Sequence, residues 1–90
     1  MKIDMTKASV KFLDKLQPKQ FRQIVRSIFK LRESPNPHDA KKLAGYPEYQ
    51  RIDIGEFRIV YRVENDVLKI AVIGKRNDDE VYKKFARKKL

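Results

Sequence analysis

The side chains of this sequence that could do chemistry are mainly guanidinium, ammonium and phenol groups. Lysine and arginine number 22 against 12 aspartate and glutamate, which gives a formal net charge of +10. So large a charge on a small surface favours a polyanion or an acidic protein as the partner. The chain has no cysteine and one histidine, His38. Disulfides, thiolate nucleophiles and histidine-rich metal or catalytic centres are therefore excluded.

The densest group of charged and phenolic side chains lies in two predicted strands joined by a tight turn. Residues 49–54 and 57–63 alternate apolar and polar side chains, as half-buried strands do. Gly55-Glu56 between them favours a two-residue hairpin turn, and the loop length then fixes the register. The predicted pairs are Ile54 with Phe57, Asp53 with Arg58, and Ile52 with Ile59.

A second turn at Asn65-Asp66 predicts a third antiparallel strand over residues 67–73. The two turns agree on one apolar face, which we expect to pack on helices. The predicted pairs of this second hairpin are Val63 with Leu68, Tyr61 with Ile70, and Ile59 with Val72. The opposite face is expected to form a mixed basic surface of Arg51, Asp53, Arg58, Val60, Arg62, Lys69, Ala71 and Ile73.

Two helices are predicted before these strands. Thr6 can cap a short helix that ends near Gln17. Pro18 suits the first turn of a second helix, and Pro-rich residues 34–37 end it. We expect the two helices to form a hairpin. The apolar stripe of the second helix, which is expected in the core, is Phe21, Ile24, Val25, Ile28 and Leu31.

Two short elements complete the pattern. Residues 1–5 alternate weakly and predict a first strand. Residues 77–80 place acids where a last helix would begin. Basic residues stand where it would end: Lys83, Lys84, Arg87, Lys88 and Lys89. The order β-α-α-β-β-β-α is an α+β fold, and we expect a single domain over residues 1–90. Without a secretory signal or a membrane-spanning apolar run, we expect a soluble cytoplasmic protein.

Several segments, taken in order, resemble the RelE family of toxins, the toxin halves of type II toxin–antitoxin pairs within the RelE/ParE superfamily. These segments are Lys42-Leu43-Ala44-Gly45, residues 49–61, Gly74-Lys75-Arg76 and Glu80-Val81-Tyr82. The resemblance covers nearly the whole chain. It implies a microbial RNase fold, in which the helical hairpin packs on a four-stranded antiparallel sheet with a short C-terminal helix.

The same resemblance implies an activity and its partners. The activity is metal-independent cleavage of messenger RNA in the decoding site of the ribosome, by attack of the RNA 2′-hydroxyl, which inhibits translation. No cofactor is implied. The implied partners are the ribosome with its mRNA and a RelB-like antitoxin with an acidic segment, in a hetero-oligomer.

Position by position, the resemblance assigns roles to five residues. Arg58 and Arg76 fall where the family keeps arginines on the phosphate. Tyr82 falls on a tyrosine that stacks on a base or assists proton transfer. Arg51 replaces a basic residue that is lysine in the best-studied member, and Asp53 stands where that member has the lysine proposed as general base. Further RNA-binding candidates are Arg62, Lys75, Lys83 and Lys84, with no metal ligand among them.

Asp53 has two interpretations. It is either the cross-strand partner of Arg58 or a carboxylate base, as in some relatives of this fold. A carboxylate beside an arginine has a lowered pKa, which weakens it as a base, and it repels a phosphate. The presence of Asp53 therefore leaves open whether the protein cleaves RNA with turnover.

Three other basic or phenolic features also have structural alternatives. Strict alternation from Val72 places Arg76 on the core side, so a bulge or the strand end near Gly74 must turn it outward. Arg76 could equally be a solvated charge. The ring of Tyr82 could simply pack. The basic C-terminal residues could complement a helix dipole or bind ribosomal RNA.

Two other functions stay open at this point. One is a ParE-like toxin that acts on DNA gyrase through protein contacts and cleaves no RNA. The other is a plain RNA-binding or antitoxin-sequestering domain. Retention of Arg58, Arg76 and Tyr82 favours the nuclease, whereas Asp53 keeps the gyrase alternative open.

Overall fold

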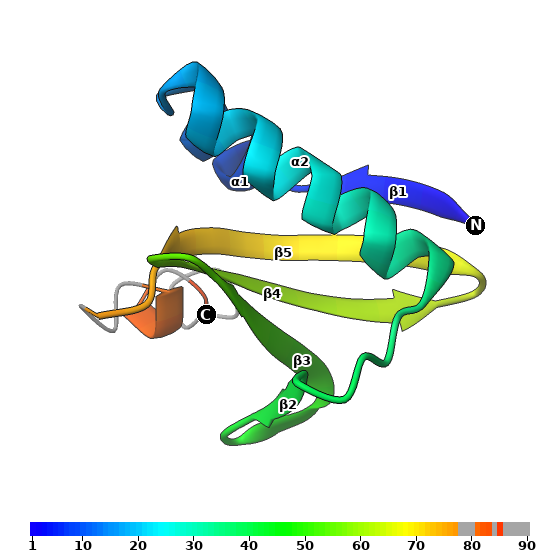
Figure 1. Cartoon of the computed structure of the whole chain (residues 1–90). Coiled ribbons are helices and arrows are strands. Elements are labelled where there is room, and N and C mark those ends of the chain that lie inside the picture. Colours follow the sequence, from blue (N-terminus) through cyan, green and yellow to red (C-terminus); the bar gives the residue numbers. More distant parts are fainter. Residues whose placement is uncertain (78–80, 84, 86–90) are drawn as a thin grey trace.

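The computed structural model describes residues 1–77, 81–83 and 85, and within them it has two complete helices and five strands, besides a few helical residues near the C-terminus. The strands make one sheet in the order β1-β5-β4-β3-β2, in which β1 runs parallel to β5 and the other neighbours are antiparallel (Figure 1). The elements are β1 (Lys2–Met5), α1 (Lys7–Asp14), α2 (Pro18–Glu33), β2 (Lys41–Leu43), β3 (Tyr46–Ile54), β4 (Phe57–Glu64) and β5 (Val67–Lys75).

The described sheet differs from the predicted sheet of four antiparallel strands, although the α+β class is confirmed. The additional strand is β2, whose register with β3 shifts between Lys42 and Leu43. With three residues, β2 is too short to show a period of two. The parallel direction of β1 was also missed, because a parallel pair needs a long crossover and leaves no turn signal between its strands.

The helices begin where their capping residues predict. Thr6 Oγ1 accepts a hydrogen bond from the Ser9 N–H at 3.2 Å and so caps α1. The same hydroxyl donates to the Ala71 carbonyl at 2.7 Å, which ties the start of α1 to β5. Pro18 is the first residue of α2, where its missing N–H breaks no intrahelical bond. Within the described residues, neither helix is long and apolar enough to cross a membrane.

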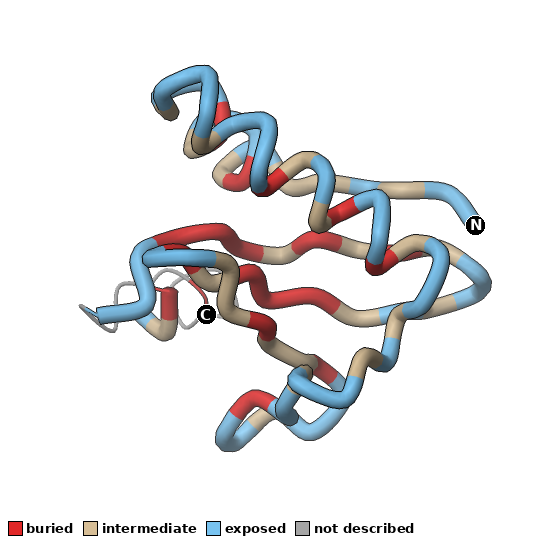
Figure 2. Tube along the Cα trace, in the orientation of Figure 1, coloured by how far each residue is buried: buried red, intermediate tan, exposed pale blue. Residues whose placement is uncertain are grey.

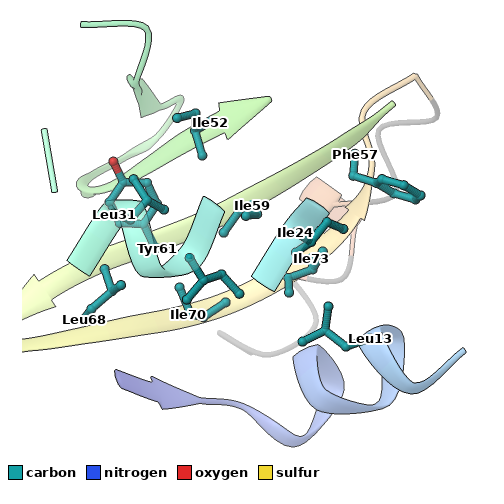
Figure 3. Packing of buried hydrophobic residues seen from close by; sticks show 11 residues of the cluster. Leu13, Ile24, Leu31, Ile52, Phe57, Ile59, Tyr61, Leu68, Ile70 and Ile73 are labelled. Carbon is teal, nitrogen blue, oxygen red and sulfur yellow. The ribbon is translucent and has the colours of Figure 1, made fainter. Parts of the chain in front are cut away.

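Both helices cover one face of the sheet and enclose the main apolar core (Figures 1 and 3). Ile24, Ile28 and Leu31 are buried there, as predicted. Phe21 is 39% exposed, so its predicted place in the core was wrong. Phe21 is the fourth residue of α2. The buried residues of this core are Leu13, Ile24, Ile28, Leu31, Ile52, Phe57, Ile59, Tyr61, Leu68, Ile70 and Ile73.

The first predicted hairpin has the predicted register. Gly55 supplies a φ of +59° in the turn between β3 and β4. In the second hairpin, Asn65 and Asp66 take φ angles of 53° and 61°, as a tight turn of this type requires. The confirmed pairs are Ile54 with Phe57, Asp53 with Arg58, Ile52 with Ile59, Val63 with Leu68, and Tyr61 with Ile70.

A β-bulge then changes the second hairpin. The register shifts between Tyr61, which pairs with Ile70, and Val60, which pairs with Val72. Ala71 is therefore an extra residue in β5. Ile59 consequently pairs with Ile73, and the predicted pair of Ile59 with Val72 was wrong. The bulge reverses the alternation of β5, because each residue after the insertion moves to the opposite face. Ile73 therefore packs in the helix-side core, not on the outer face as predicted.

The outer face of the sheet carries a second apolar cluster, so it is not the continuous mixed basic surface that was predicted. The side chains of Val60 and Val72 are buried there against Val81 and Phe85. Those C-terminal residues lie across the sheet from α1 and α2 (Figure 1). The buried members are Leu43, Tyr49, Val60, Val72, Val81 and Phe85, with Tyr46, Ala71 and Tyr82 packed against them.

The predicted C-terminal helix is described in part. Residues 81–83 and 85 are helical. Its predicted acidic start at residues 78–80 and the basic residues Lys84, Arg87, Lys88 and Lys89 lie outside the described residues. Among the described helical residues, Val81 and Phe85 are buried, Tyr82 is half-buried and Lys83 is exposed. The tube coloured by burial also shows that the middle of β4 is buried (Figure 2).

Tyr61 anchors the segment after α2 to the sheet. Its ring is buried, and its hydroxyl donates to the Pro35 carbonyl at 2.7 Å and lies 2.9 Å from Gln50 Oε1. Gln50 in turn donates to Asn36 Oδ1 at 2.8 Å. Burial, with a smaller contribution from the charge of Asp39, raises the pKa of Tyr61 to about 12.

Replacing Tyr61 by Phe should lower the free energy of unfolding by about 1–2 kcal/mol, because the Pro35 carbonyl loses its donor. Urea unfolding followed by circular dichroism measures this change. Tyr46→Phe is the matched control, with an expected change below about 0.5 kcal/mol. Since burial raises the pKa of Tyr61 from 10.0 to about 12, wild-type stability should also fall relative to Tyr61→Phe above pH 10. An unchanged midpoint in Tyr61→Phe would show that the hydroxyl anchors nothing.

Candidate active site

Asp53 and Arg58 stand at the centre of a charged group on the outer face of the sheet. They are direct cross-strand partners, because the turn at Gly55 sets β3 and β4 in that register. Arg58 Nε donates to Asp53 Oδ1 at 2.7 Å, and Arg58 Nη2 donates to Asp53 Oδ2 at 3.3 Å. The side chain of Arg58 is 14% exposed and that of Asp53 is 33% exposed. This is a bidentate ion pair open to solvent on one side.

Arg76 joins this pair from the end of β5. Its backbone N–H donates to the Glu56 carbonyl at 3.0 Å, which continues the ladder beyond β5. Its guanidinium Nη1 lies 3.8 Å from Asp53 Oδ2, and its side chain is 48% exposed. Arg76 reaches the outer face, as predicted, but not for the predicted reason. The bulge lies at Ala71, before Val72, so Val72 is itself on the outer face and Arg76 follows it by strict alternation.

Tyr82 approaches the same pair from the C-terminal segment. The centroid of its ring lies 5.8 Å from Arg58 Cζ, a cation–π contact. The buried side chains of Val81 and Phe85 hold this segment on the sheet. Phe85 packs edge-on against Tyr46 and Tyr49, with ring centroids 4.7 and 4.6 Å apart. The packing of the second cluster therefore determines where Tyr82 lies.

Asp53 is surrounded by positive charge. The hydrogen bond from Arg58 lowers the pKa of Asp53, burial opposes that effect, and the charges of Arg58, Arg51 and Arg76 lower it further. Arg51 lies two residues before Asp53 on β3 and therefore on the same face. Three arginines and one aspartate give this group a charge of 3 − 1 = +2. The structure thus brings together all five residues that the resemblance singled out as catalytic candidates.

The predicted RNA-binding residues are not gathered at this group. Arg62 is four residues from Arg58 on β4, about 13 Å along the strand. Its guanidinium packs over Tyr49 at 5.3 Å and pairs with Glu64 at 2.9 Å. Lys75 is exposed and pairs in register with Phe57, whose side chain lies in the helix-side core. Lys83 is exposed, and Lys84 lies outside the described residues.

An open group of guanidiniums with a net positive charge is suited to bind a phosphate. Arginine forms bidentate hydrogen bonds with phosphate oxygens, and donors fixed in advance stabilise negative charge as it develops. Within the described residues, no group of three His, Cys, Asp or Glu side chains is placed to hold a metal ion. Sequence reasoning missed the support that Tyr46, Tyr49 and Phe85 give to Tyr82, since no local pattern connects residues so far apart.

The sequence matches, over residues 3–80, the family model described as the ParE toxin of the type II toxin–antitoxin system parDE. No curated protein matches the sequence. Among solved structures, the free form of an Escherichia coli RelE mutant with two arginines changed to alanine is 26% identical. Its TM-score is 0.79, with 99% of this chain and 97% of that chain covered.

Two complexes of RelE with RelB are also similar. The archaeal RelE–RelB complex from Pyrococcus horikoshii is 26% identical with a TM-score of 0.75, over 86% of this chain and 96% of that chain. The intact E. coli RelBE toxin–antitoxin complex is 26% identical with a TM-score of 0.72, over 84% of this chain and 96% of that chain. The fold is therefore RelE-like.

The Asp53–Arg58 pair predicts a specific acid response. Arg58 lowers the pKa of Asp53, so the pair contributes stability above the unfolded pKa of about 3.9 and loses it as the pH falls through the lower folded value. Asp53→Asn should therefore be less stable than wild type near pH 6, and the difference should shrink below pH of about 4. Thermal unfolding of both proteins across this pH range measures it. A difference that is constant with pH would show that the carboxylate charge is not the stabilising feature.

Proposed function

This chain belongs to the family of ParE toxins of type II toxin–antitoxin systems, within the RelE/ParE superfamily, and from that premise we propose that it is a ribosome-dependent mRNA endonuclease of the RelE kind. The observation that carries the proposal is the convergence of Arg58, Arg76 and Arg51 around Asp53, with the ring of Tyr82 against Arg58. The RelE-like structure supports the same proposal.

The proposed reaction is an internal transesterification of RNA. The 2′-oxygen attacks the adjacent phosphorus, and the bond from phosphorus to the 5′-oxygen breaks. The 2′-hydroxyl loses a proton and the leaving 5′-oxygen gains one, so the products are a 2′,3′-cyclic phosphate and a 5′-hydroxyl. Negative charge accumulates on the phosphate oxygens in the transition state. Guanidiniums of Arg58 and Arg76, already fixed near one point, would stabilise that charge without a metal ion.

Other residues, inside the site and outside it, would bind the RNA on either side of the scissile phosphate. The half-buried ring of Tyr82 offers a face on which a base can stack. Arg51 adds positive charge beside Asp53. The exposed ammonium groups of Lys75 and Lys83 would contact phosphates without regard to sequence, as would Arg62 and Lys84 by the resemblance. These contacts would be sensitive to salt.

We also propose a partner and a place of action. The E. coli and P. horikoshii neighbours are complexes of RelE with the antitoxin RelB. By that likeness this toxin would form a hetero-oligomer with a cognate RelB-like antitoxin, whose acidic segment would complement a net charge of +10. The ribosome and its mRNA as targets imply action in the cytoplasm.

The family model, named for ParE, favours a second candidate function, which is action on DNA gyrase through protein contacts. A protein contact of that kind would not need several guanidiniums held close to one point. The arrangement of Arg58, Arg76 and Tyr82 and the likeness to RelE favour the nuclease.

Arg58→Ala should reduce cleavage of mRNA on programmed ribosomes by roughly 10²–10³-fold, because one fixed donor to the scissile phosphate is lost. Primer extension on mRNA incubated with purified toxin and ribosomes measures the rate. Arg26→Ala removes the same charge from the exposed side of α2 and is the matched control, expected to cleave within about threefold of wild type.

Two results would contradict the proposal. A folded Arg58→Ala that cleaves at the wild-type rate would remove Arg58 from the reaction. A wild-type protein that leaves mRNA intact on ribosomes and inhibits gyrase would support the second candidate instead.

A further inference from the structure

We propose that Asp53 is a positioning residue. It holds the guanidinium of Arg58 in one plane and restricts the position of the Arg76 guanidinium, so that both can bind one phosphate. It is not the group that takes the proton from the 2′-hydroxyl. This inference rests on the proposed nuclease function and deepens it. It concerns the catalytic candidate that stands where the best-studied member of the family has the lysine proposed as general base.

The first support is the way in which Asp53 holds Arg58. Its two carboxylate oxygens accept from Nε and Nη2, at 2.7 and 3.3 Å, so the plane of the guanidinium is fixed along one edge. The centroid of the Tyr82 ring lies 5.8 Å from Arg58 Cζ, and this contact further restricts the plane of the guanidinium. A fixed fork of donors is what bidentate binding of a phosphate requires.

The second support is that one carboxylate serves two arginines. Asp53 Oδ2, which accepts from Arg58, lies 3.8 Å from Arg76 Nη1. Two guanidiniums repel each other, and a shared negative charge between them offsets that repulsion. The side chain of Arg76 is 48% exposed, and Arg76 follows Lys75, the last residue of β5. Its side chain therefore has conformational freedom. The contact with Asp53 limits where that side chain lies.

The third support is that Asp53 is poorly arranged to accept a proton. Oδ1 of Asp53 accepts a hydrogen bond from Arg58 Nε, and Oδ2 faces both Arg58 and Arg76. A general base must present an oxygen within hydrogen-bond reach of the hydroxyl that it deprotonates. The hydrogen bond from Arg58 also lowers the pKa of Asp53, which weakens the carboxylate as a base.

Asp53 also limits how tightly the site binds phosphate. Without it, the charge of the group would rise from +2 to +3, which would strengthen the attraction for any RNA phosphate. The same change would release Arg58 from its fixed plane. Removal of Asp53 should therefore slow the chemical step without weakening substrate binding, a split that a loss of fold would not produce.

A double-mutant cycle tests the proposal with wild type, Asp53→Ala, Arg58→Ala and the double variant. Single-turnover cleavage of mRNA on programmed ribosomes gives the rate at saturation and the half-saturating concentration. Asp53→Ala alone should lower the saturated rate by roughly 10–100-fold, with the half-saturating concentration unchanged or lower. In the Arg58→Ala background the same substitution should cost clearly less than it does in wild type, because the effect through Arg58 is gone and only the effect on Arg76 remains. A loss in that background as large as the loss in the wild-type background would identify Asp53 as an independent participant and overturn the proposal.

A second measurement does not depend on cleavage. In ¹H–¹⁵N spectra, the Nε–H of Arg58 should give a slowly exchanging signal in wild type and lose it in Asp53→Ala, while the backbone signals of the core are retained. Glu64→Ala is the matched control, since it removes the carboxylate that pairs with Arg62 on the same strand. It should leave the Arg58 signal unchanged and cleavage within about threefold of wild type.

The two failures are distinguishable. A wild-type protein that leaves ribosomal mRNA intact would overturn the proposed function, and the Arg58 signal would still decide whether Asp53 positions that side chain. Persistence of the slowly exchanging signal in folded Asp53→Ala would overturn the positioning role whatever the activity.

Discussion

Asp53 and Arg58 face each other across the β3–β4 hairpin, and their bidentate bond holds the charged site in one arrangement. The register that brings them together depends on the turn at Gly55, whose φ of +59° favours glycine. A shift of one residue in that hairpin would move Asp53 to the helix side, where Ile52 and Ile59 are buried. The apolar core therefore protects the geometry of the site against such a shift, because the shift would bury charge.

Two features on the outer face complete the site. The bulge at Ala71 reverses the alternation of β5, which puts Val72 on the outer face and brings Arg76 toward Asp53. Val72 then forms part of the apolar surface on which Val81 and Phe85 pack, and that packing brings Tyr82 to Arg58. One inserted residue thus determines both how the second arginine is aimed and how the tyrosine is held.

The parts of the fold that depend on local chemistry could be predicted from the sequence. The cap at Thr6, the proline at the start of α2 and the two tight turns fixed the helices and most of the sheet register. The bulge, the parallel direction of β1 and the added strand β2 depend on long-range pairing and leave no local pattern. For the same reason, the pairing of Asp53 with Arg58 could be predicted from the turn, whereas the aromatic support of Tyr82 could not.

We propose that the guanidiniums held by Asp53 together bind one scissile phosphate of mRNA. This proposal is tested most directly by a structure of the wild-type toxin on a ribosome programmed with mRNA that carries a 2′-O-methyl group at the cleavage position. Arg58 and Arg76 should both contact the phosphate next to that group, with the ring of Tyr82 stacked on a neighbouring base. A bound toxin whose outer sheet face is turned away from the mRNA, or whose two arginines contact phosphates far apart, would contradict it.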